Sequence, residues 1–234
     1  MNYIVAALSD KGSRNKVNED ALIIRTRMTC LGAVCLAAIC DGMGGLAEGE
    51  VASAHTIRRI GEWFSYRAGS IKRFDKLVYC LERELHEISK EIMAYGQKNQ
   101  FAIGTTATMF ISAGKEYAII HVGDSRVYEA APGRKLRRLT TDQSINDVML
   151  LQAVGTTDNL KPEIIKGKVN KNSIIILCTD GFRHKNSDAD LNRGFLSGRL
   201  INRNDMERVL RVYTDRARKL GENDDISVIA VKIV

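Results

Sequence analysis

Several strand-like segments of this chain are apolar at nearly every position, and this feature most restricts the folds open to it. The clearest runs cover residues 31–39, 117–122 and 173–178, the last with three consecutive isoleucines. A strand of a half-exposed sheet alternates apolar and polar side chains, whereas a strand buried on both faces does not. These strands therefore need cover on both sides, which two central sheets between helical layers would provide.

The order of the expected elements differs from a regular alternation of strand and helix. Strand-like runs cover residues 3–8, 21–27, 31–39, 105–112, 117–122, 127–130, 173–178 and 226–234. Apolar residues recur every three or four positions over residues 51–64, over 74–95 with an end near Gly96, and over 206–220, which predicts three amphipathic helices. This order predicts an α+β fold with mainly antiparallel sheets and helices packed outside them.

Composition excludes several classes of protein. The 234 residues are 44% hydrophobic and 27% charged, and no linker, repeat or membrane-length apolar run divides them, so we expect a single domain over residues 1–234 and no membrane partner. No signal-like segment precedes the first strand and the five cysteines form no CxxC pair, so we expect a cytoplasmic protein with small buried cysteines. The net charge of +7 comes from basic residues interleaved with acidic ones, so we expect no nucleic-acid binding.

Carboxylates stand at the ends of the hydrophobic strands. These residues are Asp41, Asp124, Asp180 and Asp224. One Asp-Gly pair would be an ordinary turn, but four aspartates at the ends of buried strands can converge on one point, where their charges need a cation. Oxygen ligands suit Mg²⁺ or Mn²⁺. The carbonyl of Gly42 could join them because glycine lets the backbone come close, and Glu19 and Asp20 are further candidates before the second strand.

Seven motifs follow one another over nearly the whole chain. They are SDKGSRNKVNED (9–20), CDGMGGLAEGEVAS (40–53), GTTATMFI (104–111), HVGDSRVY (121–128), LTTDQS (139–144), CTDGF (178–182) and ENDDISVIAV (222–231). In this order they resemble the motifs of the metal-dependent protein phosphatases of the type 2C family, in its bacterial form. Each tetrapeptide alone is a weak signal, but DGMGG followed by GDSR, TDG and DDIS is specific in combination.

The resemblance implies both a fold and an activity. The fold is an αββα four-layer sandwich, with two mainly antiparallel sheets flanked by helices and a metal centre at one end of the sheets. The activity is hydrolysis of phosphoserine and phosphothreonine in proteins by a metal-activated water, without a phosphoenzyme, at a centre of two Mn²⁺ or Mg²⁺ ions with a possible weaker third. The resemblance also implies a cognate kinase whose phosphorylation this enzyme would reverse. We expect the enzyme to be a monomer.

The resemblance also implies a set of ligands. Asp41 corresponds to the aspartate that bridges the two metals, and Asp124 to an aspartate that, with Asp180, helps to bind the third. The remaining implied ligands are the Gly42 carbonyl, Asp180, Asp224, and Glu19 and Asp20 acting directly or through water.

The chain departs from the family pattern at the arginine that grips the substrate phosphate. The family position, three residues before Asn18, is Asn15 in this sequence, and Arg14 lies one place earlier. On a strand, a shift by one residue would turn the side chain to the other face, and a bulge would restore it. We expect Arg14 to bind the phosphate.

Other departures concern the surroundings of the site. The family's mobile flap follows the segment 142–144, but here the matching Gln-Ala-Val-Gly segment (152–155) comes almost directly, so the flap is expected to be reduced or absent and the site open. Asp225 stands where asparagine is usual, and it could tighten metal binding or face solvent. His184, four residues after Asp180, is interpreted as a surface histidine.

Three alternatives to a general phosphoprotein phosphatase remain at this stage. The chain could be a phosphatase for one small regulatory protein, such as an anti-sigma-factor antagonist, although the intact DGMGG motif counts against that. It could be a phosphoprotein-binding module with a degenerate site, although each expected carboxylate ligand is present. A nucleic-acid binder would show strongly salt-dependent affinity for DNA or RNA.

Overall fold

Two five-stranded antiparallel sheets face each other at the centre of the molecule. The computed structural model describes residues 1–43, 48–145, 149–195 and 200–234, so Gly44 and Gly45 of the glycine-rich turn lie outside the described residues. The first sheet has the order β1 (Tyr3–Asp10), β12 (Ile226–Ile233), β11 (Ile174–Cys178), β6 (Arg126–Ala130) and β7 (Arg137–Arg138). The second has the order β10 (Glu163–Lys168), β5 (Glu116–Val122), β4 (Ala107–Ala113), β3 (Gly32–Asp41) and β2 (Asp20–Thr29).

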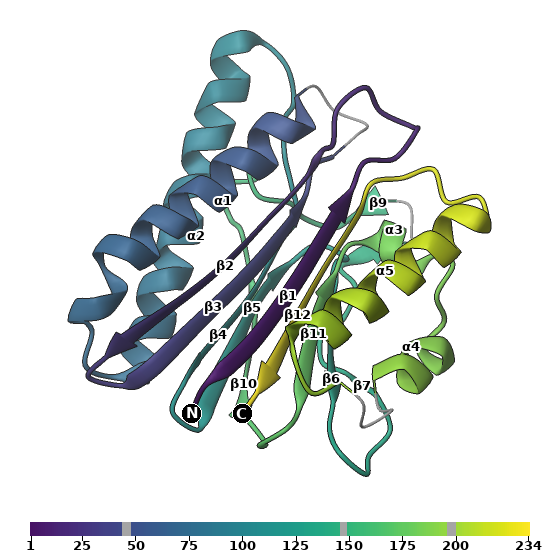
Figure 1. The fold of residues 1–234 in the computed structure, drawn as a ribbon. Coiled ribbons are helices and arrows are strands. Elements are labelled where there is room, and N and C mark those ends of the chain that lie inside the picture. The colour runs from purple at the N-terminus through teal and green to yellow at the C-terminus, as the bar shows by residue number, and fades with distance from the viewer. Residues whose placement is uncertain (44–47, 146–148, 196–199) are drawn as a thin grey trace.

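Helices cover the outer face of each sheet, as Figure 1 shows. The long helices α1 (Gly49–Tyr66) and α2 (Phe74–Asn99), with the short 3₁₀ turn η1 (Ala68–Ser70) between them, lie on the second sheet. The helices α3 (Asp180–Arg183), α4 (Asp188–Phe195) and α5 (Arg203–Lys219) lie on the first. The layers follow the order helix, sheet, sheet, helix, so the α+β four-layer sandwich expected from the sequence is confirmed.

Alternate residues of the apolar strands belong to different cores. In β3, Leu36 and Ala38 pack under α1 and α2, whereas Cys35, Ala37 and Ile39 face the other sheet. β11 follows the same rule, because Ile174 and Ile176 pack toward α4 and α5 while Ile175 and Leu177 face the second sheet. Each strand is thus buried on both faces, which explains why its sequence does not alternate.

Among the described elements of more than five residues, two are not predicted by the sequence patterns. The edge strand β10, with the sequence EIIKGK, is only partly buried, so its apolar and charged residues give no clear period. The helix α4 has eight residues, of which only Leu191 and Phe195 are buried. The end of α2 also differs slightly, because the helix continues past Gly96 to Asn99 and is terminated by Gln100 in the left-handed conformation (φ 63°).

The segment that replaces the family's flap is short. It contains β8 (Ser144–Ile145) and β9 (Met149–Leu150), which pair with each other in antiparallel fashion. Residues 146–148 lie outside the described part of the chain. The flap is therefore reduced, in agreement with the short spacing between the flanking motifs.

The cysteines follow the expectation of burial only in part. Cys35, Cys40 and Cys178 are buried, and Cys80 is partly so. Cys30 is exposed because it lies in the turn between β2 and β3, so the prediction is wrong there. All five thiols are free. Among the described helices, none is both long enough and apolar enough to cross a membrane.

Candidate metal centre

The ends of several strands meet at a cavity of about 450 Å³. β3 ends at Asp41, and β11 and β12 are antiparallel neighbours, so the end of one and the start of the other lie together. Seven of the eight residues expected at the site line this cavity: Arg14, Glu19, Asp41, Gly42, Asp124, Asp180 and Asp224. The eighth, Asp20, is buried and pairs with Asp41 across β2 and β3. The sequence-predicted residues are therefore brought to one place.

Asp20, at the start of β2, is held by the residue that follows β11. The hydroxyl of Thr179, which precedes α3, donates a hydrogen bond of 3.0 Å to its carboxylate. Burial raises the pKa of Asp20 to about 8, against the opposing effect of hydrogen bonds, and the charges of Asp225 and Asp180 add to the increase. A group in this position loses its proton at neutral pH only when a cation compensates its charge.

Asp41 lies on the cavity wall among other carboxylates. Its backbone is anchored by the two residues before β4, since its N–H donates to the hydroxyl of Thr106 at 2.9 Å and its carbonyl accepts from the hydroxyl of Thr105 at 2.8 Å. Enclosure by the protein raises the pKa of Asp41 well above its usual range, and the nearby charges of Asp20 and Asp180 raise it further. These shifts are those expected where several carboxylates share one cation site.

Gly42 occupies a turn with no room for a side chain. A Cβ atom there would lie 2.4 Å from the carbonyl oxygen of Gly49 and 2.7 Å from that of Glu19. Its N–H donates to the same Glu19 oxygen at 3.0 Å. The backbone after Asp41 can therefore approach the start of α1 and the residue before β2 only because residue 42 is glycine.

Arg14 reaches the cavity from a loop. Its Nη1 lies 2.7 Å from Oδ2 of Asp224, and its side chain is 60% exposed. Residues 11–19 lie between β1 and β2, so the alternation of a strand does not apply and Arg14 needs no bulge to face the cavity. Asn15, at the family's arginine position, donates instead to the carboxylate of Glu19 at 2.6 Å.

Asp225 neither faces solvent nor lies free beside the predicted ligands. Its two oxygens accept hydrogen bonds from the backbone N–H groups of Gly12 (2.7 Å) and Glu19 (2.8 Å). The side chain thus joins the loop of residues 11–19 to the segment before β12. Its role in the structure is to hold Glu19 and Arg14 over the cavity.

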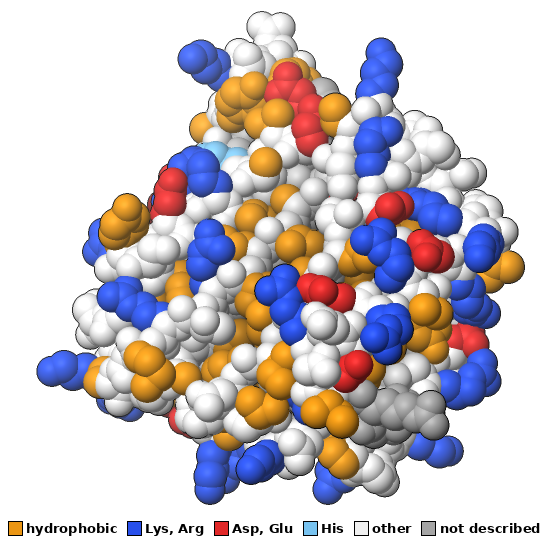
Figure 2. Space-filling model, viewed as in Figure 1, with side chains coloured by type: hydrophobic (Ala, Val, Ile, Leu, Met, Phe, Trp, Pro, Cys, Tyr) orange, Lys and Arg blue, Asp and Glu red, His pale blue; other side chains and the backbone are white. Residues whose placement is uncertain are grey.

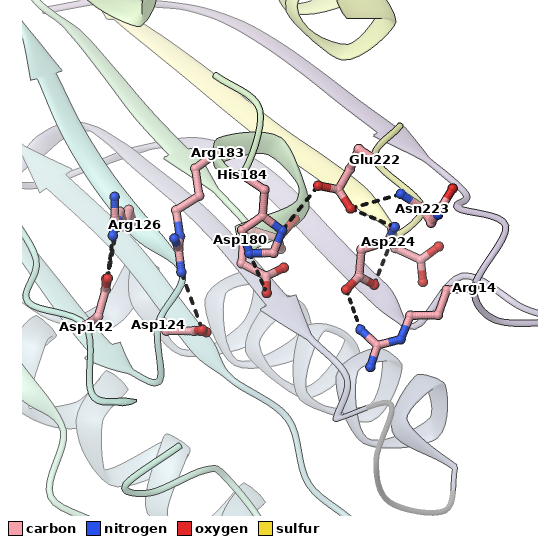
Figure 3. A network of polar contacts seen from close by, with 12 residues as sticks. Arg14, Asp124, Arg126, Asp142, Asp180, Arg183, His184, Glu222, Asn223 and Asp224 are labelled. Carbon is pink, nitrogen blue, oxygen red and sulfur yellow. Dashed lines mark hydrogen bonds and ion pairs between the residues drawn. The ribbon is translucent and has the colours of Figure 1, made fainter. Parts of the chain in front are cut away.

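His184 is not the isolated surface histidine that the sequence suggested. It lines the cavity, with Nε2 3.5 Å from Oδ2 of Asp180 and Nδ1 3.2 Å from Oε2 of Glu222 (Figure 3). The contact with Asp180 follows from helical geometry, because residues four apart lie on one face. The spacing from Asp180 was the only signal in the sequence for this contact.

Arg183 is a second residue that the sequence reasoning missed. Its Nη2 lies 3.7 Å from Oδ2 of Asp124, and its side chain is only 8% exposed. Burial raises the pKa of Asp124 to about 6, the charge of Asp180 raises it further, and the guanidinium of Arg183 opposes this change. Figure 3 shows Arg183 reaching toward Asp124 from the short helix α3.

The donor set fits divalent cations that prefer oxygen. The cavity wall offers six carboxyl side chains and one histidine. Cys40 and Cys178, the thiols nearest in sequence to Asp41 and Asp180, are both buried, and burial raises the pKa of each, that of Cys178 to about 12. Within the described ranges, no three Asp, Glu, His or Cys side chains already converge on one point. Several take protein partners instead, such as Asp224 with Arg14 and Asp20 with Thr179. Carboxylates without thiolate ligands suit Mn²⁺ or Mg²⁺ rather than structural zinc.

The chain has acidic side chains around one cavity at the strand ends of two facing antiparallel sheets, inside a four-layer sandwich. This arrangement is typical of a class of enzymes that bind divalent cations. Within that class, the chain belongs to the protein phosphatase 2C family, whose model matches residues 10–227. The serine/threonine phosphatase stp of Listeria monocytogenes serotype 4b (strain F2365) is 25% identical over 215 residues, which cover 83% of this chain and 82% of that protein.

Solved structures share the fold over the whole chain. The serine/threonine phosphatase Stp1 from Staphylococcus aureus has a TM-score of 0.86 at 22% identity, covering 98% of this chain and 94% of that one. The catalytic domain of the serine/threonine protein phosphatase PstP, in complex with 2 manganese ions, has a TM-score of 0.79 at 25% identity and covers 100% of both chains. The chain is a metal-dependent phosphoprotein phosphatase that uses Mn²⁺ or Mg²⁺.

Proposed function

We propose that the chain hydrolyses phosphoserine and phosphothreonine in proteins with two Mn²⁺ or Mg²⁺ ions bound in the cavity. Asp41 would be a ligand of both ions. Asp180, Asp224 and the carbonyl of Gly42 would complete the ligands, with Glu19 and Asp20 acting directly or through water. The observation that carries this assignment is that carboxylates from separate segments line one cavity, where burial and their charges raise the pKa of Asp41.

The cations, when bound, supply an activated water and neutralise the phosphate oxygens. The residues of the chain do the rest. Thr105 and Thr106 fix the backbone of Asp41 at the cavity wall. Asp225 fixes the backbone of Glu19. Arg14 would exchange its contact with Asp224 for the oxygens of the substrate phosphate, to which a guanidinium donates two parallel hydrogen bonds.

The test compares wild type with Asp180→Ala and, as a control, Asp215→Ala, whose side chain is exposed on α5. Hydrolysis of an aryl phosphate and of a phosphothreonine peptide is measured with Mn²⁺, with Mg²⁺ and with a chelator. We expect chelation to abolish activity and Asp180→Ala to lower kcat at least about a hundredfold, since even residues that only orient a ligand are worth about 10–100-fold. Activity that ignores both changes contradicts the assignment.

The cellular setting is also part of the proposal. We propose a cytoplasmic enzyme, supported by five free cysteines, that reverses the action of a serine/threonine kinase. We propose that nucleic acids are not ligands, because basic side chains on the face in Figure 2 are scattered among acidic and apolar ones. A salt titration with DNA and RNA that showed strong binding at low salt would contradict this.

The chain is further proposed to be one domain and a monomer. The two sheets share one core, to which Ile39 of β3 and Leu177 of β11 both contribute, so neither sheet can be removed without exposing the other. A single calorimetric transition is expected. Two separate transitions, or a sedimentation mass twice that of the chain, would contradict these two statements.

A further inference from the structure

Arg183 is not among the ligands of the proposed two-cation centre. It ends the helical turn α3, three residues after Asp180. Its side chain is almost wholly buried, and within the described residues its Nε and Nη2 atoms have no hydrogen-bond partner. A buried guanidinium with unpaired nitrogens is costly unless a negative charge compensates it. Asp124, 3.7 Å away, is the carboxylate that faces it (Figure 3).

Another nearby carboxylate, Asp142, is already paired. Asp142 receives hydrogen bonds from Nε of Arg126 at 3.1 Å and from its Nη2 at 2.6 Å, and it also pairs with Arg138. Two guanidinium groups thus compensate this one aspartate. Asp124 lies within ion-pair distance of Arg183, whose charge also acts on Asp180.

The charges on the cavity wall show what Arg183 accomplishes. Six carboxyl side chains line the cavity, and Arg14 pairs with one of them. With the buried Asp20 beside Asp41 there are seven carboxylates, more than the four negative charges that two divalent cations compensate. Arg14 and Arg183 each compensate one further charge, on Asp224 and Asp124. Arg14 is exposed and can move to a phosphate, whereas the buried Arg183 cannot leave Asp124 for solvent.

We propose that Arg183 is a built-in cation that takes the place of a third divalent ion beside Asp124. The proposal rests on the two-cation centre proposed above. A divalent ion near Asp124 would approach the fixed guanidinium, and the repulsion between the two positive charges would weaken its binding. Asp124 is then a partner of Arg183, and Asp180 remains available to the two cations.

The test counts the Mn²⁺ ions bound to the whole chain by equilibrium dialysis after removal of metal with a chelator. Wild type is expected to bind two ions. Arg183→Met removes the charge while keeping much of the volume, and we expect it to bind a third ion at least about tenfold more tightly than wild type, a difference of about 1.4 kcal/mol. Arg183→Lys keeps the charge and is expected to bind two.

Two control variants make the count decisive. Arg193→Met removes an exposed arginine that pairs with Asp190 on α4, and should leave the count at two. Asp124→Asn in the Arg183→Met background should return the count to two. The proposal is overturned if Arg183→Met still binds two ions, or if wild type binds three and Asp124→Asn alone removes one.

The wild-type and Asp124→Asn results can overturn the proposal even if Arg183→Met does not fold. They also separate this proposal from the one on which it rests. Binding of fewer than two ions by wild type overturns the two-cation centre together with the role of Arg183, whereas binding of three, one of which is lost in Asp124→Asn, overturns the role of Arg183 alone.

Discussion

At the scale of single residues, Arg14 combines two properties that suit a phosphate-binding group. It is 60% exposed, and it contacts the ligand candidate Asp224 from a loop rather than from a strand. We expect Arg14→Ala to raise KM for a phosphothreonine peptide roughly tenfold, the effect of losing a hydrogen bond to a charged group, with a smaller change in kcat. Steady-state kinetics at saturating Mn²⁺ measure both values.

Lys16→Ala is the matched control, because Lys16 is exposed in the same loop and does not line the cavity. It should leave KM unchanged, and Arg14→Lys should recover part of the loss. Equal KM values for Arg14→Ala, Lys16→Ala and wild type would show that Arg14 does not bind the phosphate. A weaker affinity for Mn²⁺ in Arg14→Ala would instead assign Arg14 to the positioning of Asp224.

The sequence could predict those site residues whose place depends on one strand. Asp41 is the last residue of a buried strand and Asp180 follows another, and that alone brings them to one end of a sheet. Arg183 and His184 could not be predicted in this way, because their roles depend on how the turn of α3 lies over the cavity. Asp225 was left open, since its partners Gly12 and Glu19 lie more than 200 residues away in sequence.

At the scale of elements, the reduced flap leaves few groups that could select among substrates. Met149 of β9 is 59% exposed at the rim of the cavity, and Leu150 lines it as well. We expect kcat/KM to vary less than about tenfold over phosphothreonine peptides that differ beside the phosphorylated residue. In a closed apolar pocket, one methylene group changes kcat/KM by about 10–200-fold, and an open site gives less discrimination. A peptide panel at subsaturating concentration measures this variation.

Two variants relate any selectivity to the hairpin of β8 and β9. Met149→Ala alters the cavity rim, whereas Leu151→Ala removes an exposed side chain outside the cavity lining. Both should leave hydrolysis of a small aryl phosphate unchanged. Selectivity above about a hundredfold in wild type would contradict the open site, and its loss in Met149→Ala alone would assign that selectivity to β9.

The start of α5 allows a prediction about stability without an effect on catalysis. Asn202 caps the helix by accepting from the N–H of Asp205 at 3.0 Å, and the side chain of Asp205 accepts in return from the N–H of Asn202. We expect Asn202→Ala to lower the free energy of unfolding by about 1 kcal/mol and Tm by about 2–4 °C, with kcat unchanged. Asn204 is exposed within the first turn of the helix, so Asn204→Ala should change Tm little. An equal decrease of Tm in the two variants would exclude the capping role of Asn202.

The predictability of each element follows from how it is buried. β3 and β11 are recognisable because both faces are covered, and α1 and α2 because one face is. β10 and α4 are harder to predict because they lie at the margins, where few positions are buried and the period is lost. The pairing of β1 with β12 joins the two ends of the chain and depends on the complete fold rather than on either segment.

At the scale of the whole molecule, the cavity couples folding to the binding of protons and cations. The pKa of Asp20 rises from 3.8 to about 8 and that of Asp124 from 3.8 to about 6, in both cases chiefly through burial. The folded chain then binds protons more tightly than the unfolded chain. Stability from these groups is complete below about pH 4 and is lost as pH rises toward 8.

A cation that binds the deprotonated site should reverse this loss. Metal and protons compete for the same carboxylates, so affinity for Mn²⁺ increases with pH. At a hundred times its Kd, a ligand that binds only the folded state stabilises it by about 2.7 kcal/mol. That gain corresponds to a Tm increase of about 5–10 °C in a chain of this size.

Thermal melts over this pH range measure the coupling. With a chelator, we expect the Tm of wild type to fall by several degrees between about pH 5 and pH 8, and with Mn²⁺ to remain level or rise. Asp20→Asn should reduce the slope in chelator because the amide cannot titrate, whereas Asp215→Asn, on the exposed face of α5, should keep it. If the Tm of wild type in chelator does not fall as the pH rises, folding does not raise the pKa values of these carboxylates. The raised pKa of Asp41 would then no longer support a cation site.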